Sequence, residues 1–578
     1  MAFSVFFGAH VLAALFSPIQ DCDEVYNFWE PTHYLNHGYG MQTWEFSPEY
    51  AIRSWLYVTL HAIPIYVGSW LPFISNKTGE FYFLRVILAF LCASCETRLF
   101  AVISKAMNPR IAIFFLIATV SSTGMFHAST SYLPSSFAMY GTLLAFAAFM
   151  GTHAGLRTAQ GLTWLAVGTI LGWPFVAVLS LPFVFEELMV SSITGEWLET
   201  FWRLLDGFVR SLVILVGYIY VRKRLSNILI VLQAFEVCVD SFFYKKLTCV
   251  PLNIIWYNVF SGSSRGPEIY GTEPWHFYFR NLVINFSVWF ILAILAFPLL
   301  IYQKRYLGLA SSRLPFHRAV IFISPLYLWL AIFTIQPHKE ERFMYPVYPS
   351  LALNAALSLH IIIVKLSSSN PRSIVGKLPP SVKLVSTSIF VLLAITAGLL
   401  RTIGLATAYS APLKVFNSLQ QPGLTDPRTT VCLGKEWYRF PSSYHLPNGA
   451  HAKFVKSEFN GLLPGEFSEA RTGFGLFPGA WLVPRGMNDE NKEDLGKYTD
   501  VEHCTYLVDS HFPGAEPSAL EPAYMLDAQR WEKVSCEPFL DTARTGILGR
   551  LLWLPDSALV PERYRRKWGE YCLLRRKR

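Results

Sequence analysis

Long apolar runs separated by short polar loops dominate the first 406 residues of the chain. A helix needs roughly 20 apolar residues to cross a bilayer. The candidate spans are 1–17, 81–103, 111–128, 132–151, 161–185, 207–243, 281–302, 318–336, 343–364 and 384–406. Pro174, in "LGWPF" (171–175), cannot continue a helix, so the range 161–185 is predicted to form two short helices, which makes about eleven spans in all.

The pattern changes after residue 406. Short apolar or aromatic runs alternate with Gly, Pro and polar turns, and about half of all Asp, Glu, Lys and Arg side chains lie in 411–578. Such a pattern is typical of several short strands. We therefore predict a membrane domain over 1–406 and a small, mixed α/β soluble domain over 407–578.

Composition supports a polytopic membrane protein. The chain is 52% hydrophobic and only 15% charged, whereas soluble proteins carry about 25% charged residues. The net charge of +9 lies partly in the basic C-terminus, which ends in "RRKR". Because no wider basic face is evident, nucleic acid is not an expected partner.

Lys and Arg in short loops predict the orientation in the membrane. Three basic loops are expected to be cytoplasmic: 104–110, 303–318 and 365–377. The opposite side then receives the long segment 18–80, the loops 244–280 and 337–342, and the C-terminal domain. Every candidate site described below falls on this non-cytoplasmic side.

Two segments need separate interpretation. The stretch 54–73 is apolar and rich in Trp and Tyr, which suits a helix lying in the membrane interface. The basic run "VRKRLSN" (221–227) interrupts the apolar range 207–243. This range either forms two spans or contains inserted sequence. Two glycosylation sequons begin at Asn76, on the predicted lumenal side, and at Asn285, which we expect to be buried in a span.

The cysteines show no CxxC…CxxC spacing. Cys92 and Cys95 lie in an apolar run and are interpreted as small core residues. Four more lie in the C-terminal domain and would be able to form disulfides in an oxidising lumen, with no pairing indicated: Cys432, Cys504, Cys536 and Cys572. No metal-ligand cluster is visible, and we expect neither a metal nor a cofactor.

The first candidate site follows the first apolar run. "DCDEVYNFWEP" (21–31) places Asp21, Asp23 and Glu24 within four residues. Like charges this close raise one another's pKa, which suits a general base near neutral pH. Neighbouring aromatic residues such as Trp29 favour a sugar site. The alternative is a solvated loop that marks the end of a span.

The second candidate is "YGTEPWHFYF" (270–279), in which Glu273 and Trp275 flank a proline. A turn leading into the next span would also explain this stretch.

The third candidate is "HKEERF" (338–343). His338, Lys339 and Arg342 are cationic donors suited to phosphate oxygens, and two glutamates can orient them. A charged hairpin between two spans is the alternative. Positive residues on the non-cytoplasmic side oppose the usual topology, which favours a functional role.

Carboxylates and a phosphate clamp on one face of a membrane suggest group transfer from a lipid phosphate. A transporter vestibule would gather similar loops, but it should place ionisable residues near the middle of spans. Most of the predicted spans lack them.

These motifs resemble glycosyltransferase family 22, polytopic enzymes of the GT-C fold that use dolichyl-phosphate-mannose. Within the family they are most similar to the α-1,2-mannosyltransferases of asparagine-linked glycan assembly in the endoplasmic reticulum. The quoted stretches carry this resemblance, as do "TWEFSPEYAIRSW" (43–55), "STGMFHASTSYLPSSFAMY" (122–140), "PLNIIWYNVF" (251–260) and "GKEWYRFPSSYHLP" (434–447). The segment 217–233 looks like extra sequence in this comparison.

The resemblance implies the reaction. Mannose would pass from dolichyl-phosphate-mannose to a dolichol-diphosphate-linked oligosaccharide with inversion, at the lumenal face of the endoplasmic-reticulum membrane. Alternatives are a glycosylphosphatidylinositol-anchor mannosyltransferase, a protein O-mannosyltransferase and a lipid-linked sugar transporter. The anchor enzymes tend to carry His-Pro-Asp-Glu where this chain has 21–24, and so resemble it less.

The resemblance also implies residue roles. Asp23 aligns with the acidic residue of the family's lumenal motif and would be the base, with Asp21 and Glu24 positioning the acceptor or tuning the base. The donor phosphate would be bound by His338, Lys339 and Arg342. The expected acceptor contacts are Trp29, Glu30, Glu273 and Trp275.

Overall fold

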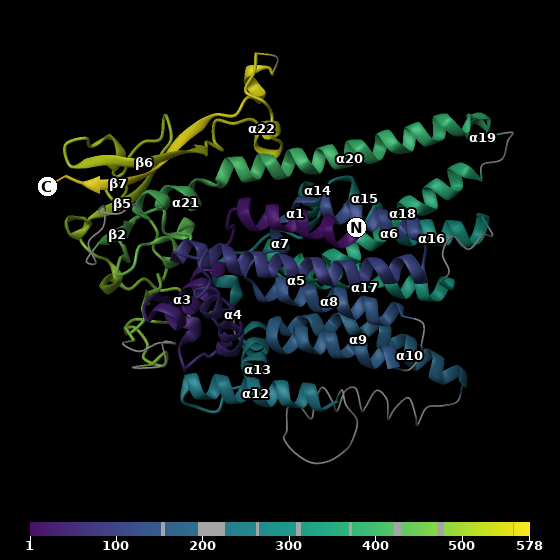
Figure 1. Ribbon diagram of the computed structural model, residues 1–578, viewed down its shortest axis with the longest axis horizontal. Helices are drawn as coiled ribbons and strands as arrows, with labels where there is room; N and C mark the ends of the chain where they lie inside the picture. Colours follow the sequence, from purple (N-terminus) through teal and green to yellow (C-terminus); the bar gives the residue numbers. More distant parts are fainter. Residues whose placement is uncertain are drawn as a thin grey trace. The chain divides into compact units, whose positions relative to one another are not determined.

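The structure is a computed structural model that describes residues 1–151, 156–194, 226–261, 265–307, 314–368, 373–420, 429–470, 479–558 and 560–577. These residues form two compact units, each built from three stretches of chain (Figure 1). Unit 1 contains Met1–Ala13, Leu88–Val237 and Gly271–Leu399, and unit 2 contains Ala14–Ile87, Cys238–Tyr270 and Leu400–Arg578. The predicted sequence ranges 1–406 and 407–578 stay a prediction.

Unit 1 is helical, and α18 (Tyr348–Ser367) forms its core. Every residue from Tyr348 to Ile361 is buried, as expected for a helix that is apolar on all sides. The other main helices are α6 (Pro109–Val120), α7 (Thr123–Ala128), α8 (Pro134–Met150), α14 (Phe277–Phe286), α15 (Val288–Ile294), α16 (Ala296–Tyr302) and α17 (Phe316–Ile335). Of these, α15 and α6 pack most closely on α18.

The predicted break near Pro174 is confirmed. Helix α9 (Leu156–Val167) continues as a short π-helix to Gly172. Trp173 is then extended (φ −128°, ψ 117°), and Pro174 begins a 3₁₀ turn that leads into α10 (Leu181–Thr194). The missing N–H of proline is harmless at the start of a helix but not inside one.

Apolar helices long enough to span a bilayer are present in the described part of the chain. They are α5 (Lys77–Ala106), α17, the continuous segment Glu341–Ser367 and α20 (Pro380–Tyr409), and the bent pair that begins with α15 and α16 would make a fifth. Shorter apolar helices include α1 (Ala2–Phe16), α6 and α8. The protein is therefore a multi-pass membrane protein, while eleven spans stay a prediction. Residues 195–225 lie outside the described residues, and with them most of the basic run 221–227 and about half of the segment 217–233.

Unit 2 contains the predicted C-terminal sheet (Figure 1). Its strands are β2 (Thr430–Leu433), β3 (His451–Phe454), β5 (Tyr506–His511), β6 (Trp531–Leu540) and β7 (Trp568–Arg576), in the order β3-β2-β5-β7-β6. The pairs β2–β3 and β2–β5 are parallel, and the pairs that involve β7 are antiparallel. The expectation of a small mixed domain with several short strands is confirmed.

Two disulfides connect this sheet, and they use the four cysteines singled out from the sequence. Cys432 of β2 bonds Cys504, just before the neighbouring strand β5. Cys536 of β6 bonds Cys572, its direct partner on β7. Disulfides form in oxidising compartments, so both bonds agree with a lumenal placement of this domain.

The segment that follows α1 belongs to the same core as the sheet. It forms α2 (Cys22–Glu24), a π-helix at Val25–Trp29 and α3 (Glu30–His37). Val25 and Tyr26 are buried in one apolar cluster with Val431 and Leu433 of β2 and with Tyr571 of β7. A second link is made by β1 (Met41–Gln42), which pairs with β4 (Gly465–Glu466).

Helix α4 (Trp55–Gly68) is the predicted interfacial helix. The Ser54 side chain caps it by accepting from the Tyr57 N–H at 3.2 Å, as Ser commonly does at this position. The apolar side chains of Leu60, Ile63 and Val67 are exposed. Their spacing of three and four residues puts them on one face, which suits contact with lipid.

Candidate active site

The acidic segment is shaped by a helix cap in unit 2. Asp21 is the N-cap of α2, and its Oδ1 accepts from the Asp23 N–H at 2.9 Å. A capping carboxylate satisfies a backbone donor at the start of a helix. This bond holds the backbone of Asp23 in place.

Asp23 is partly exposed, with 36% of its side chain accessible. A cation, Arg53, lies beside it, with Nη2 3.9 Å from Asp23 Oδ2. Arg53 is itself held by Glu45 through two hydrogen bonds of 2.8 Å, from Nε and Nη2. Such a two-bonded arginine–carboxylate pair has a well-defined geometry, so a fixed positive charge lies beside Asp23.

Arg53 and Glu45 were not among the residues predicted for the site. Both lie in "TWEFSPEYAIRSW", a stretch that carried the family resemblance. That motif was the available signal, but neither residue type nor spacing indicated that Arg53 would meet Asp23.

Glu24 is buried and faces the interior, unlike Asp23. It accepts a hydrogen bond from Trp29 Nε1 at 3.1 Å, and the buried guanidinium of Arg85 interacts with it electrostatically. A buried carboxylate needs partners of this kind. This environment fits the predicted supporting role of Glu24.

Trp29 and Glu30 are fully buried, which does not favour the predicted contact with an acceptor sugar. The indole of Trp29 packs on Phe81, with ring centroids 4.2 Å apart. Glu30 accepts from Ser442 Oγ (3.0 Å), from Ser443 N (2.6 Å) and Oγ (2.9 Å), and from Met41 N (3.0 Å). Burial raises the pKa of Glu30, although these bonds oppose the shift. Glu30 joins the acidic segment to the loop before β3.

The "HKEERF" motif forms an ion-paired cluster in unit 1, in the loop between α17 and α18. Glu340 connects two of its cations: its Oε1 lies 3.1 Å from His338 Nε2, and its Oε2 pairs with Arg342 Nε. The predicted orienting role of a glutamate thus has a geometric basis. A guanidinium such as that of Arg342 presents its N–H groups in a planar fork, a shape that suits phosphate oxygens.

His338 is placed to be protonated. Its Nδ1 lies 2.8 Å from the Gly271 carbonyl, and its Nε2 faces Glu340. Both partners are acceptors, so the imidazolium, with two N–H donors, satisfies both. Burial alone would lower the pKa of His338, but these hydrogen bonds outweigh it and raise the pKa.

Lys339 has a different environment from the one predicted. It is only 6% exposed, and its Nζ donates to the carbonyls of Gln336 and of Glu273, the latter at 2.8 Å. Burial lowers the pKa of Lys339. The ammonium group therefore clamps two loops together, and this geometry favours a positioning role over direct phosphate contact.

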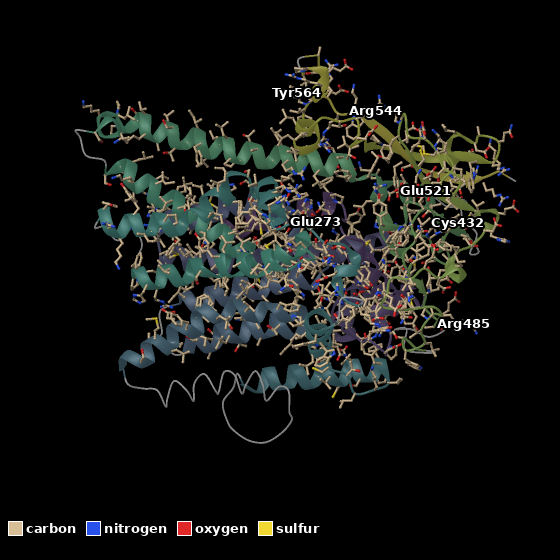
Figure 2. The ribbon with its side chains drawn as sticks, turned by 180° about the vertical axis from the view of Figure 1, so that it is seen from behind. Glu273, Cys432, Arg485, Glu521, Arg544 and Tyr564 are labelled. Carbon is tan, nitrogen blue, oxygen red and sulfur yellow. A yellow bond between two sulfur atoms is a disulfide. The ribbon has the colours of Figure 1, made fainter. Side chains whose placement is uncertain are left out.

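The clamp joins two motifs that are far apart in sequence. The Glu273 N–H also donates to the Pro337 carbonyl at 3.0 Å, so the 270–279 loop lies against the start of "HKEERF". The side chains of Glu273, labelled in Figure 2, and Trp275 are exposed, the latter by 66%. Both stay available for the predicted acceptor contact.

Glu341 anchors the cluster to α14. Its two oxygens accept from Asn281 Nδ2 at 2.9 Å and from Asn285 Nδ2 at 2.8 Å. Asn285 is 4% exposed, so the second sequon is buried, as expected. Asn76, in the first sequon, is exposed at the start of α5.

One group of possible metal ligands includes predicted site residues. Asp21, Cys22 and Asp23 each offer a ligand atom, and these atoms lie within 4.8 Å of one another. Asp21, however, already caps α2, and Arg53 lies beside Asp23.

Comparisons with known proteins agree with these motifs. The profile of the Alg9-like mannosyltransferase family matches residues 1–447. The chain is 38% identical to the Alpha-1,2-mannosyltransferase alg9 of Schizosaccharomyces pombe, covering all of this chain and 94% of that protein. It is 37% identical to the human Alpha-1,2-mannosyltransferase ALG9, covering 96% and 85%. It is 26% identical to the GPI mannosyltransferase 3 of Candida albicans, covering 57% of each chain.

Among solved structures, the chain is similar to ArnT from Cupriavidus metallidurans bound to undecaprenyl phosphate. The TM-score is 0.46 at 13% sequence identity, covering 79% of this chain and 85% of ArnT. The protein is a multi-pass membrane glycosyltransferase of the GT-C class, as its family implies. It belongs to the Alg9-like mannosyltransferase family.

Proposed function

We propose that this chain transfers mannose in α-1,2 linkage from dolichyl-phosphate-mannose to the dolichol-diphosphate-linked precursor of protein N-glycosylation. The observation that carries this proposal is the similarity, over essentially the full chain, to proteins named α-1,2-mannosyltransferases. The similarity to an anchor mannosyltransferase is weaker and covers 57% of the chain, so that alternative is not favoured.

The proposed reaction is a single displacement. The mannose in the donor is β-linked to phosphate and the product is α-linked, so the anomeric carbon inverts. The 2-hydroxyl oxygen of the acceptor mannose bonds to C1 of the donor as the bond from C1 to the phosphate oxygen breaks. A base takes the hydroxyl proton, and dolichyl phosphate leaves with the bonding electrons. One carboxylate suffices for such an inverting transfer.

We assign the base to Asp23. Its partly exposed side chain supports this role, because a base must reach the proton that it removes. The N-cap bond from Asp21 and the Arg53–Glu45 pair support a fixed position for the carboxylate. Glu24 is buried with Trp29 and Arg85, which supports a role in tuning or positioning the base and not in contacting the substrate.

We assign the donor phosphate to Arg342 and His338. Negative charge develops on the departing phosphate, and preorganised cations stabilise it. The shared partner Glu340 holds both cations in a defined geometry. Lys339 keeps the 270–279 loop against them by binding the carbonyl of Glu273.

A reconstituted transfer assay tests the function. Purified protein should move radiolabelled mannose from dolichyl-phosphate-mannose to a lipid-linked oligosaccharide, and not to protein or to an anchor precursor. Movement of lipid-linked sugar across vesicles without a new glycosidic bond would instead indicate a transporter.

Divalent metal is predicted to be dispensable for this transfer. A monophosphate leaving group can be held by the protein cations, and Arg53 already lies beside Asp23. The initial rate in excess chelator should equal the untreated rate. A rate lost on chelation and restored by Mn²⁺ or Mg²⁺ would contradict this, and would direct attention to Asp21, Cys22 and Asp23.

The C-terminal domain is predicted to lie in the lumen of the endoplasmic reticulum. In sealed microsomes, added protease should leave residues 429–577 intact, and detergent should make them accessible. Non-reducing electrophoresis should also show the two disulfides, Cys432–Cys504 and Cys536–Cys572. Digestion without detergent would invert the topology and place the proposed site in the wrong compartment.

A further inference from the structure

A cavity of about 550 Å³ lies in the C-terminal sheet domain, outside the residues assigned to catalysis. The volume falls within the roughly 300–1,000 Å³ of small-ligand sites. Its walls come from the loop after β2, the loop after β3, the end of β5 and the segment that follows β5. They include Trp437, Tyr438, Phe459, Ser510, Phe512 and Glu521. Glu521 is labelled in Figure 2. The wall residues 435–439 lie in "GKEWYRFPSSYHLP", a family motif that the proposed mechanism does not use.

Four aromatic side chains contribute to the wall, beside charged and polar ones: Trp437, Tyr438, Phe459 and Phe512. Trp437 and Phe459 form one surface, with ring centroids 4.6 Å apart, and both are only partly buried. The Tyr438 side chain is 45% exposed. Partly exposed aromatic rings suit a ligand with an apolar face and a polar rim, and a pyranose ring has both, in its axial C–H bonds and its hydroxyls.

The charges around the cavity are already paired, which argues against an anionic ligand. Glu436 is buried and binds Arg439 Nη1 at 2.7 Å and Ser510 Oγ at 2.6 Å. Lys435 Nζ lies 3.0 Å from Asp509 Oδ1. Glu521 accepts from the Glu458 N–H at 3.0 Å, and Glu458 accepts from Ser518 Oγ at 2.6 Å; such carboxylates repel phosphate. The expected ligand is therefore neutral and rich in hydroxyl groups.

The cavity wall contacts the acidic segment within the same unit. The Trp437 carbonyl accepts a hydrogen bond from Tyr26 OH at 2.6 Å, and the two rings pack with centroids 6.2 Å apart. Tyr26 follows Asp23 by three residues in the same short helical segment. A ligand held against Trp437 is thus recognised by a surface that is rigidly attached to the segment of the proposed base.

We propose that this cavity binds mannose residues of the acceptor oligosaccharide. This inference rests on the proposed function and names the site that selects its acceptor. The burial of Trp29 and Glu30 does not favour contact with a sugar, so the acceptor needs a different binding surface, which this cavity offers. Recognition of the glycan here is separate from binding of the donor phosphate by His338 and Arg342.

The test is Tyr438→Ala in the purified full-length protein, because Tyr438 is the more exposed ring of the wall and contacts Trp437 edge-on, with centroids 6.0 Å apart. The hydrogen bond between Tyr26 and Trp437 uses the Trp437 backbone carbonyl and does not involve the Tyr438 side chain. Loss of an anchoring aromatic ring should raise the acceptor KM by about tenfold. The donor KM and kcat at saturating acceptor should not change. The matched control is Tyr564→Ala, which changes a tyrosine of the same domain that Figure 2 shows well apart from Glu521, and its acceptor KM should equal that of the wild type.

A binding measurement separates this inference from the proposed function. The probe is the free oligosaccharide released from the lipid-linked acceptor, observed by saturation-transfer NMR on the Asp23→Asn protein. We expect a saturation-transfer signal from the glycan. Adding Tyr438→Ala to the Asp23→Asn protein should diminish this signal, and adding Tyr564→Ala should not. If Tyr438→Ala changes neither the acceptor KM nor the glycan signal, the inference is overturned. A wild-type protein that binds the glycan in this way but transfers no mannose would instead refute the proposed function.

Discussion

Asp23→Asn is expected to abolish mannosyl transfer while the protein stays folded and inserted in the membrane. The change is nearly isosteric and removes the proton acceptor, and general base catalysis contributes about 10²–10⁴-fold to a rate. Because Asp21 caps the helix through the backbone N–H of residue 23, which asparagine keeps, the helix start should be preserved. Initial rates at saturating donor and acceptor should fall by that factor, with acceptor binding retained.

The control for this variant is Asp494→Asn. Asp494 also accepts from a backbone N–H near a short helix, that of Gly496 at 3.0 Å, but it belongs to no proposed site. Its rate should match the wild type. Activity of Asp23→Asn within tenfold of wild type would move the base elsewhere, with Glu24 as the next carboxylate in the segment.

Arg342→Lys is expected to impair use of the donor. Lysine keeps the charge but cannot present a planar fork to Glu340 and phosphate at once. Hydrogen bonds to charged groups contribute about 1.5–3 kcal/mol, so the donor KM should rise by roughly 10–150-fold. The acceptor KM should change little. Steady-state kinetics with each substrate varied in turn measure both constants.

Arg318→Lys is the matched control for this substitution. Arg318 is also in unit 1, and its Nε pairs with Glu186 Oε1 at 2.9 Å, as Arg342 Nε pairs with Glu340. This variant tests whether weakening any arginine–glutamate pair in this unit changes the donor KM. If Arg342→Lys raised only the acceptor KM, the phosphate assignment would be wrong.

The local features of the fold were predictable because they depend on neighbouring residues. The apolar runs predicted α5, α17, α18 and α20, and the proline of "LGWPF" predicted the interruption between α9 and α10. The composition after residue 406 predicted a mixed domain of short strands. Burial of Asn285 followed from its place in an apolar run. Each feature reflects a periodicity or a backbone constraint that acts within about one helix length.

The candidate residues were also identified from the sequence, but their environments were not. Asp21, Asp23 and Glu24 are equivalent as neighbouring carboxylates, whereas the structure makes Asp21 a helix cap, leaves Asp23 partly exposed and buries Glu24. Lys339 and Arg342 are both cations of one motif, yet Lys339 binds the carbonyl of Glu273 in a distant loop and Arg342 pairs with the neighbouring Glu340. Residue type determines which bonds a side chain can form, while its partners depend on chain segments elsewhere.

By itself, the sequence determined that this is a multi-pass membrane protein with a small C-terminal sheet domain and the motifs of a mannosyltransferase family. Only the tertiary structure decided that the acidic segment packs into that sheet domain, with Tyr26 bonded to Trp437 and Glu30 bonded to Ser443. These contacts span more than 400 residues. The physical reason is that hydrophobic burial and hydrogen bonding are satisfied by any suitable partner, and spacing along the chain does not specify which partner the folded chain supplies.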